Sequence, residues 1–229
     1  MADDIFREVD DDMRMERLRL MARRYVGAAV AVAVVAAAGV GGWQYHAWRG
    51  RQDAQAWGAT YFAALHLADT SHIAPGETSA LTPQQKDAMA RLATLDNVPS
   101  GLRTLSRLER AALLASSGDT KGALALWTQV SDDQAADPLL RGLASLLWVQ
   151  HQIDDGDPAV LRSRLATLDG AGKPWRGLAQ ESEAMLDLRQ GRLADARRKL
   201  SQITTQIDVP EGLRSRAGGM LQTLNAAPS

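Results

Sequence analysis

One stretch near the N-terminus limits the possible folds more than any other feature of the chain. The run from Val26 to Trp43 contains no charged residue and consists almost entirely of Ala, Val and Gly. Together with its neighbours it covers residues 25–45, and about 20 helical residues at 1.5 Å each cross a hydrocarbon core of roughly 30 Å. Inside a bilayer, an open chain satisfies its backbone hydrogen bonds only as a helix. We therefore predict a single transmembrane helix at residues 25–45.

Charged and aromatic residues around this run predict its orientation. Aromatic residues stand at both ends, with Tyr25 before the run and Trp43, Tyr45 and Trp48 at its far end, as in an interfacial belt. Six arginines precede the run, namely Arg7, Arg14, Arg17, Arg19, Arg23 and Arg24, whereas only Arg49 and Arg51 follow it closely. Because positive residues stay on the cytoplasmic side, residues 1–24 form a cytoplasmic segment and the rest lies outside the cytoplasm.

Two other interpretations of the run stay open. The small residues Ala36-Ala37-Ala38 have the spacing of a signal-peptide cleavage site, although the preceding segment is long and acidic, unlike the short basic start of a signal peptide. The run also has the composition of a buried Ala-rich helix. Small residues recur four positions apart at Gly27/Ala31 and Ala38/Gly42, a spacing that lets a second helix approach closely.

The remainder of the chain has the composition and periodicity of an all-helical domain. Aromatic residues make up only 5% of the sequence, and Ala and Leu supply most of the apolar residues. No convincing strand alternation occurs. The predicted helices run from Trp48 to Ala68, from Pro83 to about Leu95, from Leu102 until Gly118-Asp119 ends the helix and caps the next, on through Val130, from Pro138 to Trp148, from Pro158 to Leu168, from after Pro174 to Gln190, from after Gly191 to about Gln206, and from Pro210 to about Asn225.

Helix-start signals support these boundaries. Thr82-Pro83 with Gln85 has the form of a capping box with proline at the first helical position. The pairs Asp137-Pro138 and Asp157-Pro158 each supply an N-cap oxygen and a φ angle already suited to a helix. We assign residues 46–100 to juxtamembrane helices and a linker, and residues 101–229 to a helical-repeat domain.

An internal repeat predicts the architecture of that domain. Its first copy contains Ala111, Gly118, Ala123, Trp127 and Val130, and its second copy contains Ala184, Gly191, Ala196, Leu200 and Ile203, with identical spacings 73 residues apart. In each copy the glycine ends one helix, the alanines let two helices approach, and the larger residues fill the groove between pairs. Seventy-three is close to two tetratricopeptide periods, so we predict a tetratricopeptide-like α-solenoid with these ten residues as its repeat-packing positions.

The match to that pattern is degenerate, because the usual aromatic positions of the first helix hold Leu114 and Asp187. An irregular helical bundle with coincidental spacings is the alternative. A late basic cluster, interleaved with Asp187 and Asp195, predicts a salt-bridged outer helix face, and a partner-binding face is an open alternative. The members of this cluster are Arg189, Arg192, Arg197, Arg198 and Lys199.

The whole chain resembles the tetratricopeptide-repeat-like family of ancillary SecYEG translocon subunits, in its alphaproteobacterial form. The resemblance rests on Asp4-Ile5-Phe6-Arg7-Glu8-Val9-Asp10-Asp11-Asp12, Arg110-Ala111-Ala112-Leu113-Leu114-Ala115 with Gly118-Asp119, Asp137-Pro138-Leu139-Leu140-Arg141, Pro174-Trp175-Arg176 with Glu181, and Gly191 with the helix at 194–203. The segment between Ala68 and Pro83 is longer than is usual in the family.

This resemblance implies a location and a set of partners. The implied protein is a single-pass inner-membrane protein with its N-terminus in the cytoplasm and its helical-repeat domain in the periplasm. The implied partners are the SecYEG translocon, a membrane-anchored periplasmic chaperone of the prolyl isomerase type, and exported proteins as clients. A structural scaffold of a cell-envelope or division complex is the alternative function.

Composition and motifs argue against several other functions. The formal net charge of −1 gives no reason to expect nucleic-acid binding, and the absence of cysteine excludes disulfides and thiol chemistry. The four histidines, His46, His66, His72 and His151, lack metal-ligand spacing, and Gly39-Val40-Gly41-Gly42 lacks the lysine of a phosphate loop. We therefore predict a protein that is not an enzyme and that uses no metal or cofactor.

Overall fold

The computed structural model describes the backbone of residues 2–68 and 79–226, and the side chains of residues 34–68 and 79–226. Within these ranges the fold is all-α. The α-helices are α1 (Ala2–Leu67), α2 (Pro83–Ala93), α3 (Ser100–Ser116), α4 (Thr120–Asp132), α5 (Pro138–Gln150), α6 (Pro158–Ala166), α7 (Arg176–Arg189), α8 (Leu193–Thr205) and α9 (Glu211–Ala226), and a short 3₁₀ helix, η1 (Thr94–Asn97), follows α2. This confirms the predicted all-helical class.

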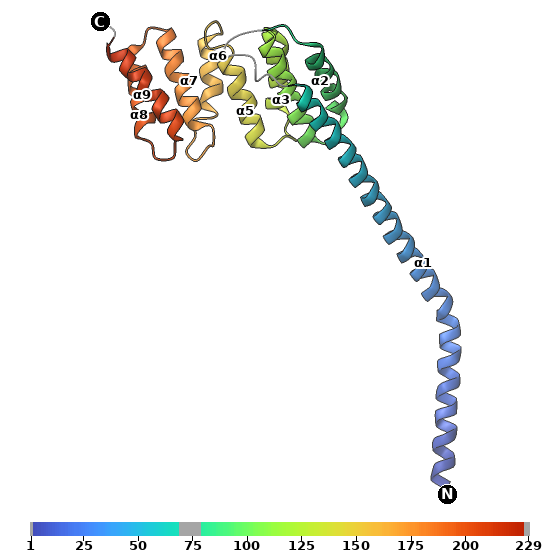
Figure 1. The fold of residues 1–229 in the computed structure, drawn as a ribbon. Helices are drawn as coiled ribbons and strands as arrows, with labels where there is room; N and C mark the ends of the chain where they lie inside the picture. The colour runs from blue at the N-terminus through green and yellow to red at the C-terminus, as the bar shows by residue number, and fades with distance from the viewer. Residues whose placement is uncertain (1, 69–78, 227–229) are drawn as a thin grey trace. The chain divides into compact units, whose positions relative to one another are not determined.

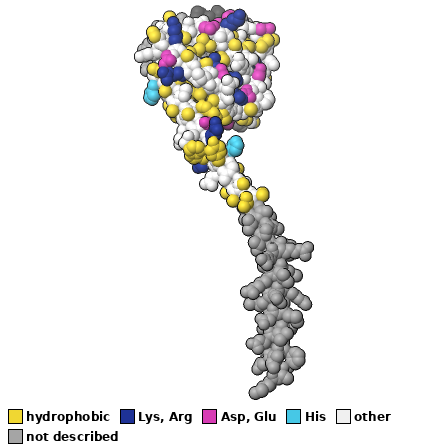
Figure 2. Space-filling view, turned by 90° about the vertical axis from the view of Figure 1, so that its right-hand side faces the viewer, with side chains coloured by type: hydrophobic (Ala, Val, Ile, Leu, Met, Phe, Trp, Pro, Cys, Tyr) yellow, Lys and Arg dark blue, Asp and Glu magenta, His cyan; other side chains and the backbone are white. Residues whose placement is uncertain are grey.

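The chain divides into two compact units, Met1–Ala56 and Trp57–Ser229. In the first unit, the described part of α1 exposes its apolar side chains, as the space-filling view shows (Figure 2). These exposed side chains are Val34, Val35, Val40, Trp43, Tyr45 and Trp48. The side chains of residues 25–33, the first part of the predicted membrane span, lie outside the described residues.

Across the residues whose side chains are described, no helix combines the length and the apolar character that spanning a bilayer requires. The span was predicted from arginine asymmetry and interfacial aromatics in a sequence rich in Ala and Gly. Alanine and glycine are the least apolar residues of such a run, so the described portion is only weakly hydrophobic.

In the second unit, successive helices from α2 to α9 pack on one another in chain order (Figure 1). The packed pairs include α3 with α4, α5 with α6, and α7 with α8, which is consistent with a helical-repeat domain. Four hydrophobic clusters follow one another along this array. Such a series of local cores is expected where each helix pair buries its apolar face mainly against its neighbours.

The three helix starts predicted from a cap followed by proline are confirmed. The Thr82 hydroxyl accepts a hydrogen bond from the Gln85 amide at 3.2 Å, and the Gln85 side chain accepts one from the Thr82 amide at 3.0 Å. The Asp137 carboxylate accepts from the Leu139 amide at 2.7 Å, and Asp157 accepts from the Ala159 amide at 2.8 Å. These bonds satisfy amides that have no partner within the helix.

The two glycines of the repeat end α3 and α7 in the same conformation. Gly118 has φ +85° and Gly191 has φ +72°, in the left-handed region that glycine tolerates. The amide of the following residue, Asp119 or Arg192, donates to the carbonyl of the residue five positions earlier, Leu114 or Asp187. This is the Schellman arrangement, and it turns the chain directly into the next helix.

The repeat extends beyond the residues that define it in the sequence. The bounds of α4 and α8 differ by 73 positions at both ends, and α5 and α9 begin 73 positions apart. The eight other repeat-packing residues are all at most 1% exposed, and Ala144 in α5 and Ala217 in α9 are likewise buried at equivalent positions. The unit α3–α4–α5 therefore recurs as α7–α8–α9, with α6 between the two copies.

Candidate functional site

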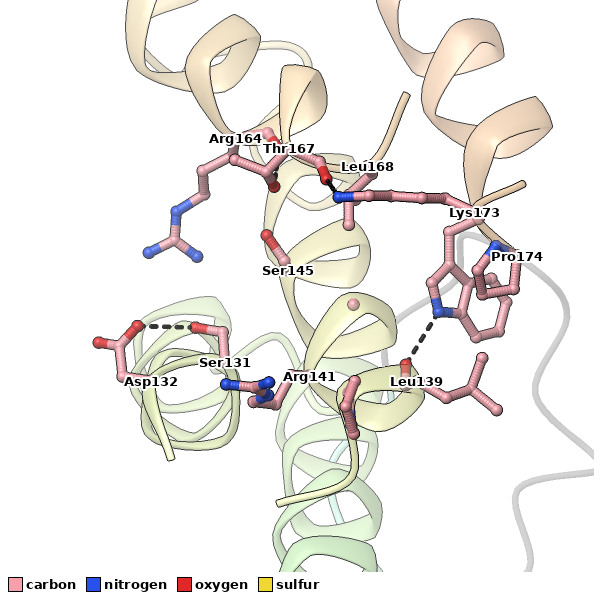
Figure 3. A pocket seen from close by; sticks show the side chains of 13 residues that line it. Ser131, Asp132, Leu139, Arg141, Ser145, Arg164, Thr167, Leu168, Lys173 and Pro174 are labelled. Carbon is pink, nitrogen blue, oxygen red and sulfur yellow. Dashed lines mark hydrogen bonds between the residues drawn. The ribbon is translucent and has the colours of Figure 1, made fainter. Parts of the chain in front are cut away.

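A cleft opens on one side of the Trp57–Ser229 unit, midway along its helical array. Its walls come from the C-terminal end of α4, the N-terminal half of α5, the C-terminal end of α6 and the segment before α7 (Figure 3). Because successive helices run up and down, these four ends meet on the same side of the array. The cleft has a volume of about 650 Å³, within the size range of ligand-binding pockets.

The length of α6 explains why there is space here. This helix has nine residues, against thirteen in α4 and thirteen in α8. The difference of four residues is about one helical turn. The sequence predicted α6 through Leu168, but the helix ends at Ala166, where the Thr167 and Leu168 amides donate to the carbonyls of Arg164 and Leu165. The early end leaves room between α5 and the segment Lys173–Trp175.

Three cationic side chains line the cleft, from three different elements. Arg141 lies on α5, Arg164 on α6 and Lys173 in the segment before α7. Among the described residues, none of the three forms an ion pair with a carboxylate. Asp132, at the end of α4, is the one acidic residue of the lining. The lining therefore carries an excess of positive charge that the protein itself leaves uncompensated.

The contacts of these cations are with neutral groups. Arg141 donates through Nη1 to the Gln134 side chain at 2.7 Å, while its buried Nε has no hydrogen-bond partner. The Arg164 guanidinium lies 3.9 Å from the centre of the Trp148 ring, a cation–π contact. Lys173 donates to the Thr167 carbonyl, as the close-up shows (Figure 3). These contacts orient the side chains without neutralising their charge.

Burial affects Arg164 in particular. Partial removal from water lowers the pKa of its guanidinium, because the charged form loses hydration, and the nearby charge of Asp132 opposes this only in part. An arginine stays protonated at neutral pH despite such a shift. A partly dehydrated cation gains more from an incoming anion than a fully hydrated one does.

The opposite wall of the cleft is apolar and fixed in position. Trp175 donates through its indole Nε1 to the Leu139 carbonyl at 2.9 Å. A Cβ atom at Gly142 would lie 2.7 Å from the Trp175 ring, so the glycine permits this close approach of the indole to α5. Leu168 and Pro174 complete the wall. The cleft thus combines an aromatic surface with three cations.

A second, smaller hollow of about 360 Å³ lies beside the first and shares Lys173, Pro174 and Trp175 with it. Its arginines are paired. Arg176 lies 3.6 Å from Asp169, and Arg216 binds Glu181 through two hydrogen bonds of 2.6 and 2.7 Å. The two arginines of the second hollow therefore have carboxylate partners, whereas Arg141 and Arg164 of the first have none, and Lys173 lines both.

None of the described histidines lines the cleft. Within the residues whose side chains are described, no group of three His, Asp or Glu residues is placed to hold a metal ion. The ring of His151 lies 4.4 Å from that of Trp127, and its Nδ1 lies 3.0 Å from the Leu147 carbonyl oxygen, to which it donates when it carries the proton. His72 lies outside the described residues.

The residues predicted from the sequence lie elsewhere. The eight buried repeat-packing residues lie in the interior between helices, and none of the ten lines the cleft. The late basic cluster serves internal contacts: Arg189 binds the carbonyls of Ile153 and Gly156, Arg197 that of Leu224, and Arg192 and Lys199 pair with Asp187. The predicted salt-bridged outer face is confirmed for Arg198 and Asp195, which pair at 2.8 Å on the surface. Asp187, by contrast, is 2% exposed, so the ion pairs of Arg192 and Lys199 with it are not part of an outer face.

Sequence reasoning missed Arg141, Arg164 and Lys173 as a group. They are far apart in the chain and show no periodic relation. The available signals were the Pro138–Arg141 stretch and the Pro174-Trp175 pair, both of which now border the cleft. Comparisons with protein-family models, with curated proteins and with solved structures find no match for this chain.

Proposed function

We propose that the protein is a non-enzymatic interaction module in which a tetratricopeptide-type domain, residues 101–229, binds segments of partner polypeptides. The observation that carries this proposal is the cleft, with three cations that have no carboxylate partner facing a fixed indole. Helical-repeat arrays bind extended chain segments on surfaces that span several helices. The 73-residue recurrence of α3–α5 as α7–α9 supports the same architecture.

The proposal includes a membrane anchor at residues 25–45. It is supported by the arginines before the run, the aromatic residues at its ends, and the exposure of Trp43, Tyr45 and Trp48 on α1. A single anchored helix confines the interaction domain to the membrane surface. Confinement raises the effective concentration of the domain toward membrane-bound partners without any additional contact.

Resemblance supplies the proposed partners and location. We place the protein in a bacterial inner membrane, with residues 46–229 in the periplasm. Its partners are then the SecYEG translocon and a membrane-anchored periplasmic chaperone, and its clients are proteins emerging from the translocon. In the alternative function, a cell-envelope scaffold, the same domain holds stable envelope proteins together and never contacts exported chains.

Site-specific photo-crosslinking in cells distinguishes the two functions. A photoreactive residue is placed at Leu139, which lines the cleft and is 46% exposed, and in a second variant at Lys121, which is exposed at the opposite end of α4. We expect crosslinks from position 139, but not from 121, to translocon components and to newly exported chains. Crosslinks only to stable envelope proteins favour the scaffold, and the absence of any polypeptide crosslink from the cleft contradicts the interaction module.

A further inference from the structure

We infer that the cleft lined by Arg141, Arg164 and Lys173 selects polypeptide segments in which carboxylate side chains stand next to an apolar side chain. This inference rests on the proposed function and specifies the chemistry of the partner segment. It follows from the charge of the lining, from the nature of the opposite wall, and from the size of the cleft.

The lining of the cleft carries an excess of positive charge. The lining contains three cations and one acid, and none of the three cations is ion-paired among the described residues. In the neighbouring hollow, Arg176 and Arg216 have carboxylate partners from the protein itself. Arg141 and Arg164 have no such partner among the described residues. A ligand that brings negative charge into the first cleft supplies it.

The wall opposite the cations is apolar. Trp175, Leu168 and Pro174 present apolar surface that faces the same space as the cations. The indole is held by its hydrogen bond to Leu139 and by the absence of a side chain at Gly142, so its position is already fixed before a ligand arrives. Because the indole is already fixed, an apolar group of the ligand can pack against it with little loss of conformational entropy. An inorganic anion has no such group.

Size and rim distinguish a peptide from a lipid. A volume of about 650 Å³ is far larger than a single small anion needs, and it suits a few side chains of an extended segment. Among the large hydrophobic residues of the lining, only Leu139 counts as exposed, at 46%. A surface that inserts into a bilayer presents a row of exposed apolar residues. The rim of this cleft has no such row. Hydroxyl groups of Ser131, Ser145 and Thr167 instead line the space.

Peptide binding to the full chain in mild detergent tests this inference. The probe is a short fluorescent peptide rich in Glu and Phe, and its control is the same peptide with every Glu replaced by Gln. We expect the Glu peptide to bind at least tenfold more tightly, and Arg141→Gln and Lys173→Gln each to weaken it about tenfold, as expected for one charge-assisted hydrogen bond. Lys121→Gln removes the same charge from an exposed site at the far end of α4 and should leave the affinity unchanged.

Several outcomes would overturn the inference. They are equal binding of the two peptides, equal affinities for Lys173→Gln and Lys121→Gln, and binding of phosphatidylglycerol vesicles in place of the peptide. Thermal unfolding followed by circular dichroism confirms that each variant is folded. If crosslinks from position 139 to exported chains occur while the Glu peptide fails to bind, the charge selectivity is wrong and the interaction module stands. If both are absent, the proposed function fails as well.

Discussion

At the scale of single residues, the two copies of the repeat hold different types of side chain at two equivalent positions. The position of Leu114 in α3 holds Asp187 in α7, and the position of Leu126 in α4 holds Lys199 in α8. Both leucines belong to one hydrophobic cluster, whereas Lys199 and Asp187 form an ion pair of 2.9 Å. The second copy therefore has an ion pair at the two positions where the first copy has two leucines.

This exchange predicts how the second copy responds to substitution. Asp187→Leu should lower the free energy of unfolding by about 3 kcal/mol, because it removes the buried partner of Lys199 and of Arg192. The double variant Asp187→Leu/Lys199→Leu restores the apolar pair of the first copy and should lie within about 1.5 kcal/mol of the wild type. Urea unfolding measures both. A double variant as unstable as the single one would show that the two positions are not equivalent.

The charge state of Lys199 follows from the same contacts. Burial by itself lowers the pKa of this amine, but hydrogen bonds to Asp187 and Glu183, together with the charges of those carboxylates, outweigh it and raise the pKa above its usual value. Lys199 is therefore charged throughout the physiological range. Its pairing contributes to stability up to strongly alkaline pH and is lost as the pH rises through the raised pKa.

Glu109 in α3 has the same direction of pH dependence as Lys199, but near the acidic end of the pH range. Burial raises the pKa of its carboxyl group, and none of the described residues forms an ion pair with it. The folded state then binds a proton more readily than the unfolded state, so the free energy of unfolding decreases as the pH rises past the ordinary glutamate value. Glu109→Gln should raise the melting temperature at pH 7 and have little effect below about pH 4.

A matched substitution controls for general effects of losing a carboxylate. Glu183→Gln removes one partner of Lys199, which lies 3.0 Å away, and should lower the melting temperature at pH 7. The two variants are compared by thermal unfolding at both pH values. An equal shift for Glu109→Gln at pH 7 and pH 4 would exclude desolvation of its charge as the cause.

At the scale of helices, the sequence predicted starts better than ends. The starts of α2, α5 and α6 depend on Thr82, Asp137 and Asp157, whose side chains bond amides two or three residues later. Such interactions are local and are visible in the sequence. The end of α6 at Ala166 has no glycine to mark it. The apolar pattern continues to Leu168, which is buried in the core although it is no longer helical.

We expect the glycine turns that end α3 and α7 to depend on the left-handed backbone conformation of Gly118 and Gly191. Gly118→Ala and Gly191→Ala should each lower the free energy of unfolding by about 1–2 kcal/mol, because each forces a side chain into a left-handed backbone conformation. No atom lies within 4 Å of a Cβ built at Gly191, so its cost is conformational and not steric. Gly219→Ala, inside α9 and with equally open surroundings, should instead raise the stability by about 0.5–1 kcal/mol.

Urea unfolding of the three alanine variants measures these differences on one scale. Equal changes at positions 118, 191 and 219 would mean that the turns do not depend on the left-handed conformation. A loss confined to position 118 would mean that α7 and α8 do not form a helix pair equivalent to α3 and α4. The comparison therefore tests the repeat as well as the glycines.

At the scale of the whole molecule, the fold was predictable and the cleft was not, for the same physical reason. Each helix pair buries its own apolar residues, so periodicity and caps within about 35 residues determine the array. The cleft instead depends on Arg141, Arg164 and Lys173, which different elements bring together, and on one helical turn that α6 lacks. No local rule relates these residues to each other.

The weakly apolar run leads to a prediction about the proposed membrane anchor. Gly39 and Gly42 lie in the predicted span, and no atom lies within 4 Å of a Cβ built at either position. If a helix of a membrane partner packs against these glycines, Leu at both positions should block its approach while favouring lipid insertion. We expect Gly39→Leu/Gly42→Leu to resist alkaline extraction from membranes better than the wild type and to copurify less translocon.

The control for this last prediction lies on the same helix. Gly50 is exposed on α1 beyond the predicted span, and a Cβ there also meets no atom within 4 Å, so Gly50→Leu adds the same apolar group outside the bilayer. It should change neither extraction nor copurification. Unchanged copurification of the Gly39→Leu/Gly42→Leu variant would show that the span meets lipid alone. The association with partners would then have to come from the helical domain outside the membrane.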